Sequence, residues 1–132
     1  MTTYAELITR SLRSLGIIEA SEVAKGKELI TGLETLNEML HALITDGVDL
    51  EHTDGAQQDT MAFPDDHIGP FRYLLAVRLS TEYGVQPTQV VFGLANDGLK
   101  QLQRRYIVPD TLEMPETLQA IFNPNNLYLS RL

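Results

Sequence analysis

Two short stretches of the sequence carry residues that could bind a metal ion. In the first, Glu38 and His41 have the Glu-x-x-His spacing used in di-iron helical bundles, and Glu34 lies one turn before them. Such a site needs a second Glu-x-x-His pair from another helix, but neither His52 nor His67 has a glutamate three residues before it. We therefore interpret the first stretch as the solvated acidic face of a helix.

The second stretch is Asp65, Asp66 and His67, which could bind a cation. Acidic residues at a helix start more often cap the helix or interact with the positive end of its dipole. We expect the two aspartates to act in this way, and the sequence predicts no metal site at either stretch.

The stretch GLANDGLK at 93–100 has two glycines and a lysine, as a phosphate-binding loop does. The motif requires Gly-Lys followed by Ser or Thr after a strand. Here Leu99 separates Gly98 from Lys100, and the stretch lies inside a predicted helix. The chain also lacks a Gly-x-Ser-x-Gly motif and a cysteine nucleophile. We expect no catalytic residue, no cofactor and no enzymatic activity.

Composition and charge narrow the class of protein further. The 132 residues are 43 % hydrophobic and 21 % charged, which is typical of one globular domain, and no apolar run approaches the roughly 18–20 residues needed to span a bilayer. The net charge of −8 divides into −9 for residues 1–66 and +1 for residues 67–132. An acidic chain binds DNA poorly, and a helix-turn-helix in the first half is disfavoured by its glutamates.

Hydrophobic periodicity predicts the elements that would position any site. The expected helices are Tyr4–Leu15, with a Thr3–Glu6 capping box; Ser21 to about Thr45, with Ser21 as the cap; Asp65 or Asp66 to Tyr83; and about Thr88 to Tyr106. We predict an all-α antiparallel bundle of four main helices in residues 1–107. Residues 48–66 form an irregular insertion, either a hairpin around Asp54-Gly55 or an extended loop.

The third predicted helix is apolar around most of its circumference, which is typical of the central helix of a bundle. Arg72 and Arg78 interrupt it. We expect Arg78 to be mostly buried and therefore paired with an acid, in the bundle or on a neighbouring molecule. Gly93 and Gly98 in the fourth helix predict close helix contact or a kink.

Residues 108–132 change in character and are predicted to form an extended C-terminal arm with a short helix near Pro115–Phe122. Ordering such a segment costs about 1–2 kcal/mol per residue, so it needs a surface to bind. We predict that the arm binds a partner by adding a strand or by filling a groove. The alternative is that it packs on its own bundle. The predicted anchors are apolar or aromatic, namely Ile121, Phe122, Leu127, Tyr128, Leu129 and Leu132.

The order of these pieces resembles a known family. "ELITRSLRSLGI", a long helix ending "LITDGV", a polar loop, "FPDDHIGPFRYLLAVRLSTEYGV" and a last amphipathic helix are similar to the head-to-tail adaptors of tailed bacteriophages, especially short-tailed ones. These are also called head-completion, connector or packaged-DNA stabilisation proteins. The resemblance covers about residues 4–107. The positions that match the family pattern of the third helix are Leu75, Ala76, Arg78, Leu79, Tyr83 and Gly84.

The resemblance implies a structural virion protein at the head–tail junction, made in the host cytoplasm. Its partners would be the portal protein, neighbouring adaptor subunits in a ring that is typically twelvefold, and tail proteins. Packaged DNA would pass through the ring without sequence-specific binding, and no membrane would be involved. An acidic lining suits such a channel, because adhesion would stall the DNA.

Two other functions remain open from the residues alone. One is a generic helical module for protein–protein interaction, without catalysis. The other is a metal-bundle enzyme, which the missing ligands make least favoured.

Overall fold

The computed structural model describes residues 2–50 and 55–106. Four helices make up the fold of this part: α1 (Tyr4–Ser14), α2 (Lys27–Thr45), α3 (Asp65–Tyr83) and α4 (Gln89–Tyr106). The described residues contain no strand, although an isolated antiparallel bridge joins Thr3 to Thr60. The predicted all-α fold of four main helices is confirmed.

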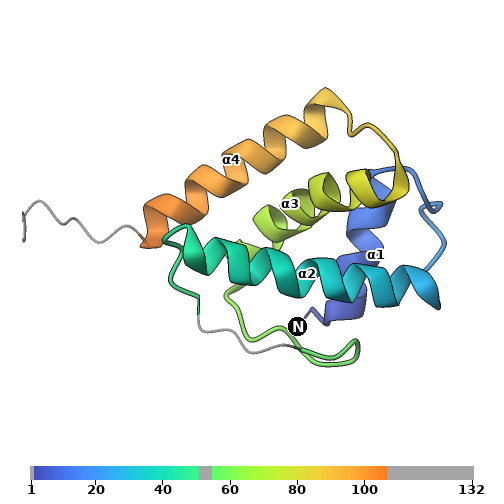
Figure 1. The fold of residues 1–132 in the computed structure, drawn as a ribbon, viewed down its shortest axis with the longest axis horizontal. Coiled ribbons are helices and arrows are strands. Elements are labelled where there is room, and N and C mark those ends of the chain that lie inside the picture. Colours follow the sequence, from blue (N-terminus) through green and yellow to red (C-terminus); the bar gives the residue numbers. More distant parts are fainter. Residues whose placement is uncertain (1, 51–54, 107–132) are drawn as a thin grey trace, which may run out of the picture.

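The α3 helix is the centre of the arrangement. It packs against α1, α2 and α4, whereas α4 packs extensively only on α3. Figure 1 shows α3 between α4 and α2, with α2 and α4 running in one direction and α3 in the opposite direction. The helix α1 crosses α2 near the start of α2. Two outer helices, α2 and α4, therefore flank the central one.

The core lies where α1, α2 and α3 meet. Most of its fully buried members come from these three helices, the loop between α2 and α3 adds Val48, and α4 adds Leu102. Burying each such side chain contributes about 1.5–3 kcal/mol. The fully buried apolar side chains of the three helices include Leu7, Ile8, Leu12, Leu36, Leu40, Phe71, Leu75 and Leu79.

The start of α1 follows the sequence signal. The amide of Glu6 donates to Oγ1 of Thr3 at 3.2 Å, and the amide of Thr3 donates to Oε2 of Glu6 at 3.4 Å. Two amides that the first helical turn leaves unpaired are thus satisfied reciprocally. The predicted capping box is confirmed.

The start of α2 was predicted wrongly. Ser21 does not cap the helix, which begins at Lys27 after Gly26, whose φ of 55° is in the left-handed region. Contacts with α1 hold the preceding segment out of the helix: Arg13 donates to the carbonyl of Glu22 from Nε at 3.0 Å and from Nη2 at 2.7 Å, and the amide of buried Ala24 donates to Oγ1 of Thr9. These tertiary contacts outweigh the capping preference of serine.

The contact between α3 and α4 is close because of one glycine. A β-carbon at position 98 would lie 2.8 Å from the Cα of Pro70, so only glycine fits without a shift of the backbone. A β-carbon at position 93 would have no other atom within 4 Å. The prediction of close helix contact is confirmed at Gly98, and Gly93 has no such role.

The described parts of the segment between α2 and α3, residues 46–50 and 55–64, contain no strand, as in the extended-loop alternative. Asp54, in the turn of the hairpin alternative, lies outside the described residues. Val48, Leu50 and Met61 are buried in the core. The loop also lies along the N-terminus, where the amide of Met61 donates to the carbonyl of Thr2 at 2.9 Å and that of Tyr4 to the carbonyl of Asp59 at 3.1 Å. The loop is therefore part of the packed domain.

None of the helices in the described ranges is both long and apolar enough to cross a membrane.

Candidate functional site

The predicted arm anchors lie outside the described residues. Ile121, Phe122, Leu127, Tyr128, Leu129 and Leu132 all fall in the range 107–132, as does the short helix near Pro115–Phe122. Their role in partner binding stays a prediction. The candidate surfaces considered below belong to residues 2–50 and 55–106.

The predicted burial of Arg78 is wrong. Arg78 is exposed on α3, and it forms no ion pair with the residues that the structure describes. The physical reason is its position on the outer side of α3, where water solvates the guanidinium and no compensating acid is needed. A pairing with an acid on a neighbouring molecule remains a prediction.

The arginine that bonds within the bundle is Arg72, which is partly buried. Its Nε donates to Oγ of Ser14 at 2.9 Å, and Oγ of Ser11 donates to its backbone carbonyl at 3.0 Å. Its guanidinium also lies 5.3 Å from the centre of the Tyr73 ring. Arg72 therefore joins α3 to α1 through hydroxyl groups, without an acidic partner.

The residues with di-iron spacing lie apart from other metal ligands. Glu34, Glu38 and His41 are exposed on the outer face of α2. Within residues 2–50 and 55–106, no group of three or more His, Asp or Glu side chains is placed to hold a metal ion. The interpretation of this stretch as a solvated acidic face agrees with its exposure.

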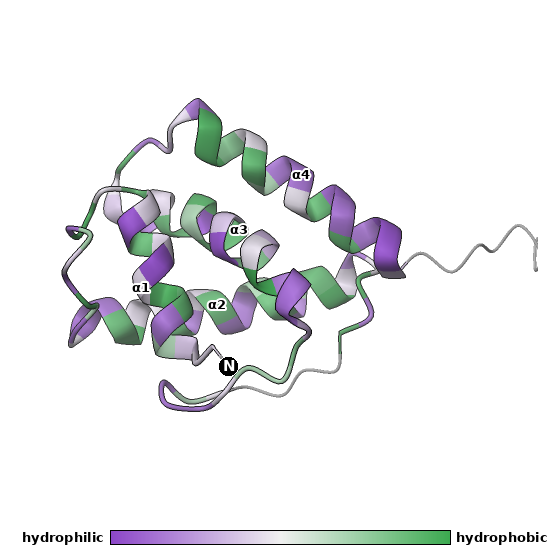
Figure 2. Cartoon of the chain, turned by 180° about the vertical axis from the view of Figure 1, so that it is seen from behind, coloured by the Kyte–Doolittle hydropathy of each residue, from purple (hydrophilic) through white to green (hydrophobic). Residues whose placement is uncertain are grey.

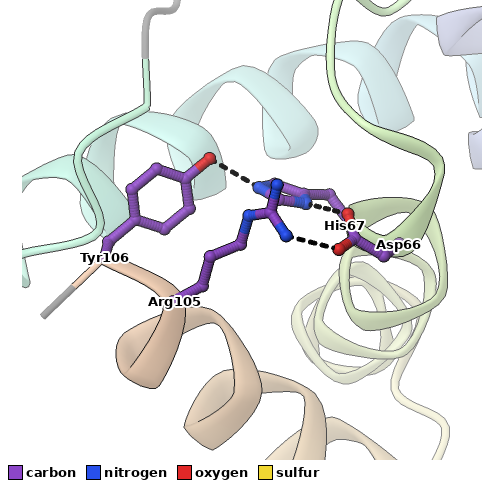
Figure 3. Close-up of polar contacts among 4 residues, drawn as sticks. All are labelled: Asp66, His67, Arg105 and Tyr106. Atoms are coloured by element: carbon purple, nitrogen blue, oxygen red, sulfur yellow. Dashed lines mark hydrogen bonds and ion pairs between the residues drawn. The ribbon is translucent and has the colours of Figure 1, made fainter.

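The stretch Asp65–His67 belongs to a polar cluster that sequence analysis missed. We call it the α3–α4 clamp and define it as Asp66, His67, Arg105 and Tyr106 (Figure 3). Nδ1 of His67 lies 2.7 Å from Oδ1 of Asp66, and Nε2 of His67 lies 2.5 Å from the hydroxyl of Tyr106. Nη1 of Arg105 donates to Oδ2 of Asp66 at 2.7 Å. The clamp thus ties the start of α3 to the end of α4.

The electrostatics of the clamp favour an ionised Asp66. The hydrogen bond from His67 lowers the pKa of this carboxyl group below its usual 3.8, and the charge of Arg105 lowers it further. An ionised carboxylate can only accept hydrogen bonds, so Nδ1 of His67 donates to Asp66, and Nε2 is hydrogen-bonded to the hydroxyl of Tyr106. Both ring nitrogens are then occupied.

The histidine of the clamp is buried, and both of its ring nitrogens are already hydrogen-bonded. The side chain of His67 is only 1 % exposed, and its ring packs edge-on against Phe71 and Tyr106, with centroids 5.8 and 5.4 Å away. Both ring nitrogens of this buried histidine are bonded to protein groups, so neither is free to bind a metal ion. Asp65 and Asp66 do lie in the first turn of α3, but neither side chain caps it. The clamp links the start of α3 to the end of α4, and Asp66, His67 and Arg105 also line a surface pocket.

Exposed apolar side chains mark a second kind of site. Val90, Phe92 and Leu94 are 70, 51 and 39 % exposed; we call them the apolar end of α4. Val23 and Ile30, near the start of α2, are 57 and 53 % exposed. Figure 2 shows the first half of α4 as mainly hydrophobic and its second half as mainly hydrophilic. Because α4 is a helix, Val90 and Leu94 share one side of it and Phe92 lies on the other. Exposed apolar side chains on a surface are typical of protein–protein contact.

On both helices, exposed charged residues follow the exposed apolar residues along the chain. On α4, Lys100 and Arg104 are exposed beyond the apolar end, whereas on α2 Glu34 and Glu38 are exposed beyond Ile30. On α2 the exposed Lys27 and Ile30 are thus followed by acidic residues. On α4 the exposed apolar residues are followed by Asp97, Lys100 and Arg104, which have a net positive charge.

No known family model matches the chain, and a search of curated proteins finds no match either.

Sequence reasoning missed both the apolar end of α4 and the α3–α4 clamp, but only the first has a signal in the sequence. The run VVFGL at 90–94 has four apolar residues in five positions, and a helix that buries one stripe must expose some of them. The clamp joins residues that are 39 positions apart, and no local pattern indicates that pairing.

Proposed function

We propose that this chain is a head-to-tail adaptor of a tailed bacteriophage. It forms a ring beneath the portal, extends the DNA channel, helps to retain packaged DNA and offers a platform for the tail. The observation that carries this proposal is the order of the sequence pieces, described above, together with their fold as a small all-α domain.

Two structural observations support the proposal. The described domain exposes apolar side chains on both outer helices, which suits a subunit that is covered by neighbours on two sides. Its described polar cluster with close hydrogen bonds, the α3–α4 clamp, serves packing. Exposed apolar side chains of this kind are typical of a protein whose surfaces bind other proteins.

The direct test mixes the purified chain with portal rings of the phage that encodes it and examines the product by electron microscopy. We expect an added ring of density on the tail-facing side of the portal. A portal that stays bare, with no ring formed by the free protein either, would overturn the proposal.

Deleting residues 110–132 separates this proposal from a self-contained interaction module. The described core is formed by residues of α1–α4 and of the two segments that join α1 to α2 and α2 to α3. We therefore expect the truncated chain to keep its helical circular dichroism and melting temperature but to lose incorporation on the portal. Loss of the folded state on truncation would instead favour a module that uses the arm in its own core.

A further inference from the structure

The outer faces of α2 and α4 match each other in pattern and oppose each other in charge. On α2, Ile30, Glu34 and Glu38 follow at four-residue intervals along the exposed face. On α4, Phe92, Asn96 and Lys100 do the same. In each helix a charged residue, Glu38 or Lys100, follows the apolar one by eight positions, which corresponds to about 12 Å along the axis.

The two faces do not meet within one molecule, because α3 lies between α2 and α4 (Figure 1). We infer that they meet between molecules: α4 of one copy packs in parallel against α2 of the next, with Phe92 against Ile30 and Lys100 against Glu38. The occupant of each face is thus a second copy of this chain. This inference rests on the proposed function and specifies the contact that builds its ring.

The charges on the two faces indicate that each face binds a second copy of this chain. Neither Glu38 nor Lys100 has a side-chain hydrogen bond or ion pair among the described residues, so both are available to a neighbour. With the exposed Lys27 and Asp97 included, the face on α2 still has a net negative charge and the face on α4 a net positive charge. Two copies of α4, or two of α2, would therefore bring together faces of the same net charge. The pairing that complements charge is α4 against α2.

The direction of the helices then determines the kind of assembly. Within one molecule α2 and α4 run the same way (Figure 1). A parallel contact between α4 and the next α2 therefore keeps successive copies in the same orientation. Such a contact is heterologous, meaning that two different faces meet, and repeated contacts of this kind close into a ring or extend into a filament.

A disulfide experiment tests the proximity of the two faces. The chain contains no cysteine, so introduced thiols are the only ones present. We expect Ile30→Cys mixed with Phe92→Cys to give a crosslinked dimer under oxidation, because a disulfide needs β-carbons about 3.5–4.5 Å apart. The double variant should give a ladder of larger species on a non-reducing gel. Either single variant crosslinking to itself as well as the mixture would overturn the proposal.

A charge exchange tests the ion pair. We expect Lys100→Glu or Glu38→Lys alone to weaken self-association about tenfold or more, measured by sedimentation or by occupancy on portal rings, and the two together to restore it. Lys25→Glu is the control for Lys100→Glu, since Lys25 is exposed outside both faces. Circular dichroism checks that each variant folds.

A second control tests the register. Glu34 lies one helical turn before Glu38 on the same face. If Glu34→Lys rescues Lys100→Glu and Glu38→Lys does not, the proposed register is wrong. If wild-type protein decorates the portal while neither single charge reversal weakens self-association, this interface is overturned and the adaptor function stands. If the wild type neither self-associates nor decorates the portal, both proposals fail.

Discussion

At the scale of single residues, the α3–α4 clamp shows how a buried histidine is satisfied. His67 bonds to Asp66 through one ring nitrogen and to Tyr106 through the other, and Asp66 also bonds to Arg105. A buried polar group that loses its partner costs about 1–3 kcal/mol, more than the bond itself contributes. Each partner of His67 is therefore a place where a small change should be measurable.

The substitution Tyr106→Phe removes one hydroxyl group and little else. It leaves Nε2 of His67 buried without a donor, so we expect the free energy of unfolding to fall by about 1–3 kcal/mol in chemical denaturation. Tyr73→Phe is the control, because the ring over Arg72 is kept and no hydrogen bond of the Tyr73 hydroxyl is present in the described residues. Equal stability of Tyr106→Phe and wild type would show that the bond contributes nothing.

The lowered pKa of Asp66 predicts a pH dependence of stability. The ionised carboxylate is favoured in the folded state, so its contribution is present above the usual pKa of 3.8 and is lost as the pH falls through the lowered value. In Asp66→Asn this loss should be absent, and stability measured from about pH 6 down to about pH 2 should fall less steeply than in wild type. Asp65→Asn, which removes a neighbouring first-turn acid, should keep the wild-type slope.

At the scale of the elements, substitutions of two glycines of α4 should have opposite effects on the free energy of unfolding. Gly98→Ala places a β-carbon against the backbone of Pro70, and we expect the free energy of unfolding to fall by about 1–3 kcal/mol despite the better helix propensity of alanine. Gly93→Ala meets no atom, so it should raise this free energy by up to about 1 kcal/mol. The measurement is urea denaturation of both variants. The same sign for both would show that the helix contact does not decide the effect.

Element boundaries were predictable wherever local chemistry decides them. The capping box at Thr3 and the left-handed Gly84, with φ 64°, fix the start of α1 and the end of α3 from neighbouring residues alone. The start of α2 depends on Arg13 and Thr9, which lie in another helix, so the serine signal failed. Periodicity identified the helices, and tertiary hydrogen bonds set the boundary that it missed.

The candidate surfaces were less predictable than the fold. Sequence reasoning placed the partner-binding residues in the arm, outside the described part, and expected a buried Arg78 that is exposed. Periodicity shows which residues share a helix face, but exposure depends on which other helix covers that face. The apolar end of α4 is exposed because α3 covers only the stripe that contains Val91, Ala95 and Gly98.

At the scale of the whole molecule, the uneven charge of the sequence becomes a difference between two sides. The acidic first half includes the outer face of α2, and the exposed end of α4 is basic, with α3 between them. A molecule with unlike sides attracts its own copies in one orientation and repels them in others. Salt would screen this preference, since exposed charges interact over about 8–10 Å at ordinary ionic strength.

The attachment of α4 to α3 alone has a consequence for local unfolding. At its last turn the α3–α4 clamp fastens α4, whereas Val90, Phe92 and Leu94 in its first turns bury little surface. The least costly opening of the molecule is therefore fraying of α4 from its first residues, with the clamp as the hinge and α1–α3 left intact. We expect such a helix to open locally before α1–α3 do, and a neighbour that covers its first turns should slow the exchange of its amide hydrogens.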